Sequence, residues 1–159
     1  MAKRFRNMSE DRPDSVCVAL LEGSGNDARV LIMRRSRGAF AGAWTFVLGG
    51  IEKGERAPAA AIREVGEETG LRVEQLYLAG AFDTFYDPRR DTIRKVAVFA
   101  GRVATRDVRL DDAHDDYRWV TFAEANELLE FPSQRRLLPD LERDFIRNEP
   151  RGWRRLDTR

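Results

Sequence analysis

The sequence contains little cysteine, little lysine and no long apolar run. Cys17 is the only cysteine among the 159 residues, so no disulfide can form within the chain, and its apolar neighbours predict a buried small side chain. No segment approaches the roughly 20 apolar residues of a membrane-spanning helix. Residues 1–14 are charged throughout and lack the apolar centre of a signal peptide. We therefore expect a cytoplasmic protein with no membrane partner.

The charges nearly cancel, with 28 basic and 27 acidic residues. A net charge of +1 provides no global field that would attract bulk nucleic acid or an anionic membrane. Most of the basic residues are arginines, whose planar fork suits phosphate and carboxylate groups. A compositional bias of the source genome explains this excess equally well, so the excess alone assigns no function.

Apolar runs separated by turn residues predict a single α+β domain. We expect strands at 15–21, 29–33, 44–48, 71–86, 92–103 and 117–120, and helices at 59–69, from Thr121 onwards and at 133–147. This order favours a mixed sheet flanked by helices over a regular βαβ repeat. The domain would span residues 15–147. A polar arm over 1–14 would precede it, and a polar tail over 148–159, loose unless Trp153 docks, would follow it.

Three acids share one face of the helix expected at 59–69. Glu64, Glu67 and Glu68 stand at i, i+3 and i+4, which places their carboxylates side by side. Repulsion within such pairs costs only a few tenths of a kcal/mol at a surface, so a solvated helix face is one interpretation. The apolar character of the remaining helix positions indicates that the helix packs against the rest of the protein, which favours a functional cluster.

A hard cation would neutralise these acids. Clustered carboxylates without cysteine or histidine suit Mg²⁺ or Mn²⁺, which prefer oxygen ligands. Glu55 adds a carboxylate in the loop before the helix, and Arg63 can pair with Glu67 four residues later. The paired glycines Gly49 and Gly50 let the backbone approach a ligand closely.

This stretch resembles the Nudix box, G-x5-E-x7-R-E-U-x-E-E-x-G-U, where U is aliphatic. The specified positions are all filled, by Gly49, Glu55, Arg63, Glu64, Val65, Glu67, Glu68, Gly70 and Leu71. The paired arginines after the second strand, a tryptophan upstream of the box and "YRWV" at 117–120 before two helices are also usual in Nudix hydrolases. The resemblance covers roughly residues 15–147. It implies an α/β/α sandwich with a central mixed sheet.

The resemblance also implies an activity and roles by position. Nudix hydrolases cleave a nucleoside diphosphate linked to another group, X, with a divalent metal. Glu67 and Glu68 would be metal ligands, and Glu64 would be a further ligand or the base that orients the attacking water. Glu55 would support the cluster through a second metal or a water, and Arg63 would orient a carboxylate through a salt bridge.

Residues outside the acidic helix complete the expected site. The carbonyl of Leu48, just before the glycine pair, would be a further metal ligand. Trp44 and Phe85 could stack on a base, although aromatic residues in strands usually belong to the core. The two arginines after the second strand could reach phosphates or simply end that strand. The expected substrate-binding residues are Arg34, Arg35, Trp44, Phe85, Gly49 and Gly50.

Two stretches depart from the common family pattern. Many relatives have Pro-Gly-Gly where this chain has Val47-Leu48-Gly49, and a similar pattern occurs in the branch of dATP and dihydroneopterin triphosphate pyrophosphohydrolases. Relatives often carry Glu-His before the tryptophan of "YRWV", where this chain has Ala113-His114. An aspartate within 111–116 could replace that glutamate, or these acids could form a solvated loop. We expect His114 to be a loop histidine.

The most favoured expectation is hydrolysis of a nucleoside triphosphate, or a similar triphosphate, to a monophosphate and pyrophosphate. Alternatives are the hydrolysis of ADP-ribose, a sugar nucleotide or a dinucleoside polyphosphate, and a non-catalytic nucleotide sensor. The expected partner is a small-molecule nucleotide or related phosphoanhydride. Nudix proteins are often dimers, so a homodimer is a possible partner that rests on the resemblance alone.

Overall fold

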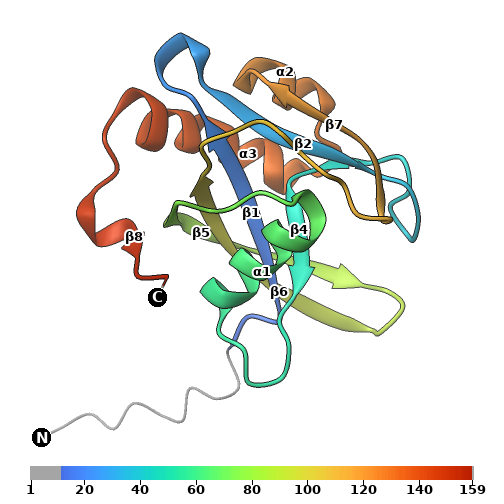
Figure 1. Cartoon of the computed structure of the whole chain (residues 1–159). Helices are drawn as coiled ribbons and strands as arrows, with labels where there is room; N and C mark the ends of the chain where they lie inside the picture. The colour runs from blue at the N-terminus through green and yellow to red at the C-terminus, as the bar shows by residue number, and fades with distance from the viewer. Residues whose placement is uncertain (1–11, 159) are drawn as a thin grey trace, which may run out of the picture.

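The computed structural model describes residues 12–158, so most of the expected N-terminal arm lies outside the described residues. Its strands form one sheet, and its helices lie around that sheet (Figure 1). The strands are β1 (Ser15–Glu22), β2 (Arg29–Arg35), β3 (Trp44–Thr45), β4 (Val47–Gly50), β5 (Gln75–Asp87), β6 (Thr92–Arg102), β7 (His114–Val120) and β8 (Arg155–Leu156). The helices are α1 (Ala57–Thr69), α2 (Phe122–Leu128) and α3 (Pro132–Glu142), which a π-helical segment, η3 (Arg143–Arg147), extends; 3-10 turns lie at η2 (Gly25–Asp27) and η4 (Gly152–Arg154).

The sheet is mixed, as the sequence predicts. Its main path runs β3-β2-β1-β6-β5-β8, with β4 paired to β1 and β7 paired to β2. Only β1 and β6 run parallel among the described strand pairs. The other edge of β1 is shared, because β4 pairs with residues 15–18 and β2 pairs only with residues 21–22. The sheet therefore splays between β2 and β4.

Helices cover both faces of the sheet, which confirms the three-layer expectation. Side chains alternate along β1, so Val16, Val18 and Leu20 face α1 while Ala19 and Leu21 face the other helices. On the first face α1 contributes a small apolar stripe. On the second face, α2 and α3 contribute Ala125, Leu138 and Leu141. Figure 1 shows α1 on one side of the strands and α2 with α3 on the other.

Local signals set the ends of the helices. Pro58 lies in the first turn of α1, where the N–H that it lacks has no helical partner. Gly70 ends α1 with a φ of 68°, a left-handed conformation that glycine adopts without strain. Thr121 and Glu124 form the expected capping box at the start of α2, each side chain accepting a hydrogen bond from the backbone of the other.

The strand expected at 44–48 is two strands. It breaks at Phe46, whose N–H donates to Oε1 of Gln134 in α3 at 3.1 Å instead of to a neighbouring strand. Residues before the break pair with β2, and residues after it pair with β1. The strand expected at 117–120 begins three residues earlier, at His114, which pairs with Arg35 of β2.

The expectation of a loose C-terminal tail is wrong. Arg155 and Leu156 form β8, which pairs with the edge of β5. Arg154 donates to the carbonyl of Ala79 at 3.1 Å and forms a salt bridge with Asp144 at 3.0 Å. Trp153 does not dock, since 67% of it is exposed. Within residues 12–158 no helix is both long enough and apolar enough to cross a membrane.

Candidate metal centre

The side chain of Glu64 lies against the backbone of Gly49. A Cβ added at residue 49 would come within 2.0 Å of Cδ of Glu64, which is closer than atoms in proteins approach without a bond. Residue 49 is therefore glycine because the end of β4 and the carboxylate of α1 occupy adjoining space. Burial raises the pKa of Glu64 above its ordinary value, despite a hydrogen bond from Arg63.

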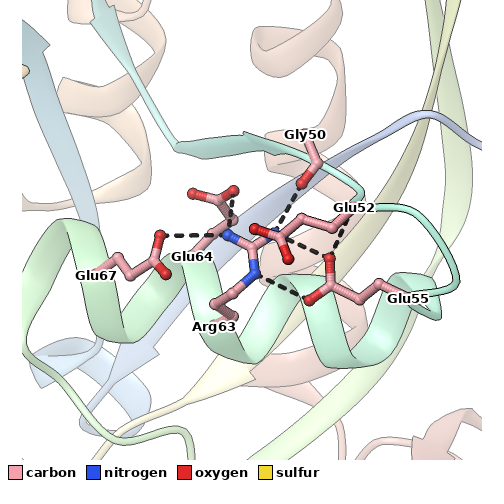
Figure 2. Close-up of polar contacts among 6 residues, drawn as sticks. All are labelled: Gly50, Glu52, Glu55, Arg63, Glu64 and Glu67. Carbon is pink, nitrogen blue, oxygen red and sulfur yellow. Dashed lines mark hydrogen bonds and ion pairs between the residues drawn. The ribbon is translucent and has the colours of Figure 1, made fainter.

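Arg63 connects the acids on the outer part of α1 (Figure 2). Its guanidinium grips Glu55 with two hydrogen bonds, of 2.9 and 3.0 Å, and donates to Glu64 at 2.8 Å. It also reaches Glu67 at 3.2 Å and the carbonyl of Gly50 at 2.9 Å. Such a forked contact fixes direction as well as charge. Arg63 thus holds one face of the acidic cluster in a defined geometry, which fits the orienting role expected from the sequence.

Glu55 is the carboxylate that this network stabilises most clearly. Hydrogen bonds from Arg63, followed by one from the N–H of Glu52, lower the pKa of Glu55 to about 2. The Glu67 side chain is 60% exposed and meets only Arg63 in the described part of the chain. The Glu55 carboxylate is therefore ionised at neutral pH, so it can attract a cation or a water.

Glu68 occupies a different environment. It is 6% exposed, and within residues 12–158 its Oε2 atom has no hydrogen-bond partner. Burial, and after it the carboxylates of Glu64 and Asp111, raise the pKa of Glu68 to about 8. A buried carboxylate of this kind is costly unless a cation or a donor compensates for its lost hydration.

Asp111 and His114 complete the surroundings of Glu68. One ligand atom from each of these three residues lies within 4.8 Å of the others. The ring Nδ1 of His114 lies 2.7 Å from Oδ1 of Asp111, and the N–H of Asp111 reaches the carbonyl of Glu68 at 3.3 Å. The expectation that His114 is a loop histidine is wrong, because it is 6% exposed and opens β7.

The two arginines that follow the second apolar run face different neighbours. Arg34 forms a salt bridge with Asp115 at 2.7 Å and lies over the ring of Trp44. Arg35 lies nearer the acidic cluster, where its charge lowers the pKa of Glu68 in part. The buried Nε atom of Arg35 lacks a hydrogen-bond partner within the described residues. An unpaired buried donor therefore lies near an unpaired buried carboxylate oxygen.

The structure separates the two expected stacking residues. Trp44 is 9% exposed and belongs to the core, with Arg118 4.8 Å from its ring centroid. Phe85 is 42% exposed and lines a pocket together with Leu48. The backbone of Leu48 also forms a hydrogen bond with the Glu68 side chain. β4 therefore lies between that pocket and the acids of α1. Phe85 therefore faces this pocket, and Trp44 is not among the residues that line it.

The donor set fits a divalent metal ion. Carboxylate oxygens dominate it, which suits Mg²⁺ or Mn²⁺, and the one histidine nitrogen adds a ligand of the kind that transition metals take. Glu68 supplies a buried oxygen that has no partner in the described part of the chain, and Asp111 with His114 could hold the same ion. The sequence alone did not indicate which aspartate within 111–116 would be the ligand, and the structure places Asp111 beside Glu68. Its three-residue spacing from His114 was the available signal.

Comparison with known proteins agrees with this geometry. The NUDIX domain model matches residues 11–141. The chain belongs to the NUDIX domain family. It is 36% identical over 108 residues to the nucleoside triphosphatase NudI of Salmonella agona, a match that covers 60% of this chain and 74% of that protein. The chain, a Nudix hydrolase, also superposes on the dihydroneopterin triphosphate pyrophosphohydrolase of E. coli, with a TM-score of 0.66 and 24% identity. The superposition covers 84% of this chain and 96% of that one, which shows a shared fold.

A further relative shares only part of its length with this Nudix domain. The octanoyltransferase of Myxococcus xanthus is 39% identical over 127 residues, which cover 76% of this chain but 34% of that protein. The chain thus spans about a third of that relative, so an acyl-transfer activity does not follow from the match. The match does include much of the Nudix segment.

Proposed function

We propose that this Nudix hydrolase cleaves a nucleoside triphosphate, or a similar triphosphate, into a monophosphate and pyrophosphate with the help of a divalent metal ion. The observation that carries the proposal is the buried, unpartnered Oε2 of Glu68 beside Asp111, His114 and Arg35. The nucleoside triphosphatase activity named for a 36% identical relative supports the choice of substrate. A cytoplasmic location and a possible homodimer, both expected from the sequence, remain part of the proposal.

Glu68, Asp111 and His114 would hold the metal, with Glu67 and the carbonyl of Leu48 as the further ligands expected from the family. Mg²⁺ or Mn²⁺ would screen phosphate oxygens and lower the pKa of a bound water. The chain's own residues supply position and direction, which account for much of the rate in phosphoryl chemistry.

Glu64 is our candidate for the base that takes the proton of the attacking water. Nη1 of Arg63 holds Oε1 of Glu64, which leaves Oε2 to orient a water. Burial raises the pKa of Glu64, and a raised pKa makes a carboxylate a better proton acceptor. Arg35 would donate to the phosphate chain through its Nε atom, which has no partner among residues 12–158. Water adds to the α-phosphorus, the α–β bridge breaks, and pyrophosphate leaves.

Pyrophosphate and phosphate release from a substrate panel with Mg²⁺ tests the proposal. The panel contains nucleoside and deoxynucleoside triphosphates, dihydroneopterin triphosphate, ADP-ribose, a sugar nucleotide and a dinucleoside polyphosphate. We expect pyrophosphate from a triphosphate with the wild type and with Glu127→Gln, an exposed helix glutamate in α2, but not with Glu68→Gln. Turnover of ADP-ribose or of a dinucleoside polyphosphate alone would replace the triphosphate assignment. Nucleotide binding without turnover would favour the sensor.

A further inference from the structure

A pocket of about 260 Å³ opens on the face of the sheet opposite α1, between β5, β6 and the start of α3. Its apolar walls include Phe40, Leu48, Phe85 and Phe131, and its polar side chains include Asp83 and Gln134. The rings of Phe40 and Phe131 meet edge to face at 5.1 Å. Pockets that enclose drug-sized ligands measure roughly 300–1,000 Å³. This one has room for a single ring system and leaves the rest of a nucleotide outside.

Gln134 presents a hydrogen-bond donor to this pocket. Its Oε1 accepts the N–H of Phe46 at 3.1 Å, and only the oxygen of an amide can accept that bond. The orientation of the amide is therefore fixed, and its NH₂ group is left to face a ligand. Within residues 12–158 that NH₂ group has no partner. Gln134 is 4% exposed, so a ligand donor or acceptor that meets it is shielded from water.

Asp83 presents an acceptor to the same pocket. Its Oδ1 takes the N–H of Thr84 at 2.8 Å, and its Oδ2 has no other partner in the described part of the chain. Asp83 is half-buried on β5. A carboxylate offers two oxygens in one plane, so it accepts most strongly from two adjacent N–H donors.

The pocket adjoins the metal centre. Cys17 and Leu48, paired neighbours on β1 and β4, both line it. Burial, and then the carboxylates of Asp83 and Glu68, raise the pKa of the Cys17 thiol. The two carboxylates therefore flank one buried side chain, Asp83 from the pocket and Glu68 from the acidic cluster. β4 lies between the pocket and the acids of α1, so the phosphate chain of a ring in the pocket has to pass β4 to reach the metal ligands.

We propose that the pocket binds the ring of the substrate, and that Asp83 and Gln134 select a carbonyl, a ring N–H and an amino group in a row. Guanine and reduced pterins share this edge, with Asp83 accepting from the two donors and Gln134 donating to the carbonyl. Uracil and thymine place a second carbonyl against the carboxylate, and adenine and cytosine place an unprotonated ring nitrogen there. The inference rests on the proposed function for the identity of the attached phosphates.

Inosine triphosphate separates this proposal from simple stacking, because it lacks only the amino group of GTP. We expect the wild type to have a kcat/KM for GTP about 10- to 100-fold above that for ITP, the range of one charge-assisted hydrogen bond. Asp83→Asn should bring that ratio close to one. Asp87→Asn, on the same strand but outside the pocket, should leave the ratio unchanged. A wild type that does not distinguish the two, or an Asp83→Asn protein that still does, overturns the proposal.

Gln134→Glu provides a second variant that keeps an oxygen for the N–H of Phe46 and removes the donor. We expect its kcat/KM for GTP to fall at least about tenfold, with a far-ultraviolet circular dichroism spectrum like that of the wild type. A Gln134→Glu enzyme that matches the wild type on GTP overturns the role of Gln134. A comparison of GTP and dGTP with dihydroneopterin triphosphate distinguishes guanine from a reduced pterin as the ring that carries these hydrogen-bonding groups. Preference for ATP or dTTP over all three overturns the proposal.

Calorimetric titration without metal keeps the pocket separate from the hydrolytic activity. We expect GMP to bind more tightly than IMP to the wild type, and equally with IMP to Asp83→Asn. If this holds while no triphosphate yields pyrophosphate, the pocket assignment stands and the proposed function fails. If triphosphates are hydrolysed without regard to the base, the proposed function stands and the pocket assignment fails.

Discussion

Gly49 and Glu64 share a space that admits only one side chain. The terminal carbons of Glu64 fill the volume that a Cβ at residue 49 would occupy, with contacts of 2.0 to 2.3 Å. The glycine at the end of β4 thereby sets the position of a carboxylate that comes from α1. A Cβ added at residue 49 would clash with the flexible end of Glu64. Its main effect would therefore be to displace that carboxylate, with less effect on the fold.

Gly49→Ala is therefore expected to lower kcat by about 100-fold or more, while thermal unfolding changes little. Displacement of an orienting group by about 1 Å can cost that much in rate. Gly66→Ala, inside α1 where a Cβ meets nothing, is the matched control. It should keep its activity and gain about 0.5–1 kcal/mol of stability. Near-normal turnover of Gly49→Ala would count against the role of Glu64.

The stability of the metal-free protein should depend on the ionisation of Glu68. Its folded pKa of about 8 lies above the unfolded value of 4.5, so the folded state holds its proton more tightly. The stabilisation is complete below pH 4.5 and is lost as pH rises through about 8. Chemical denaturation in a chelator should show wild type losing a few kcal/mol over this window relative to Glu68→Gln. Parallel pH profiles of the two proteins would contradict this assignment.

Mg²⁺ or Mn²⁺ should stabilise the wild type through the ligands around Glu68. At 100 times the dissociation constant, binding adds about 2.7 kcal/mol to the free energy of unfolding. Asp111→Asn should lose most of this gain because it removes a carboxylate from the cluster. Asp112→Asn changes an exposed neighbour and serves as the control. Equal metal-induced shifts in melting temperature for both variants would exclude Asp111 as a ligand.

Arg63→Lys should reduce kcat/KM by about 10- to 100-fold while the charge is preserved. A lysine ammonium cannot reproduce the forked contact with Glu55 together with the bonds to Glu64 and Gly50. Arg56→Lys, exposed at the N-terminus of α1, provides a control for the change of side chain. Steady-state kinetics on the preferred triphosphate would decide, and an Arg63→Lys enzyme with normal kinetics would remove the orienting role.

The C-terminal strand should contribute measurably to stability. Arg154→Ala removes a half-buried salt bridge to Asp144 and a donor to the carbonyl of Ala79. We expect a loss of about 1–3 kcal/mol in urea denaturation, since the carbonyl of Ala79 loses this donor and Asp144 keeps only its hydrogen bonds from Arg143. Arg155→Ala, whose side chain is exposed, should change stability by less than about 0.5 kcal/mol. Identical midpoints for the two variants would show that the tail is dispensable.

Signals of short range were read correctly from the sequence. The spacing of the acids with Gly49 and Gly70 placed α1, and the pair Thr121 and Glu124 placed the start of α2. Each of these depends on residues within a few positions of one another or on a fixed spacing. The mixed sheet followed from the order of the elements.

Features that depend on distant partners were not accessible in this way. The break at Phe46 requires Gln134, 88 positions later, and nothing near Phe46 indicates it. The burial of His114 depends on its neighbours Arg35 and Glu68 from other elements. The two-residue β8 exists because the edge of β5 offers it free backbone groups, which the polar tail sequence does not reveal.

The helices on the two faces of the sheet carry different groups of side chains. α1 bears the acids, and α3 bears the glutamine of the pocket, with the sheet between them. Substitutions on α3 can therefore accumulate without disturbing the carboxylates. A duplicated copy of the gene could acquire a new preferred base through a few changes in one layer, while the inherited hydrolytic machinery stays intact in the other.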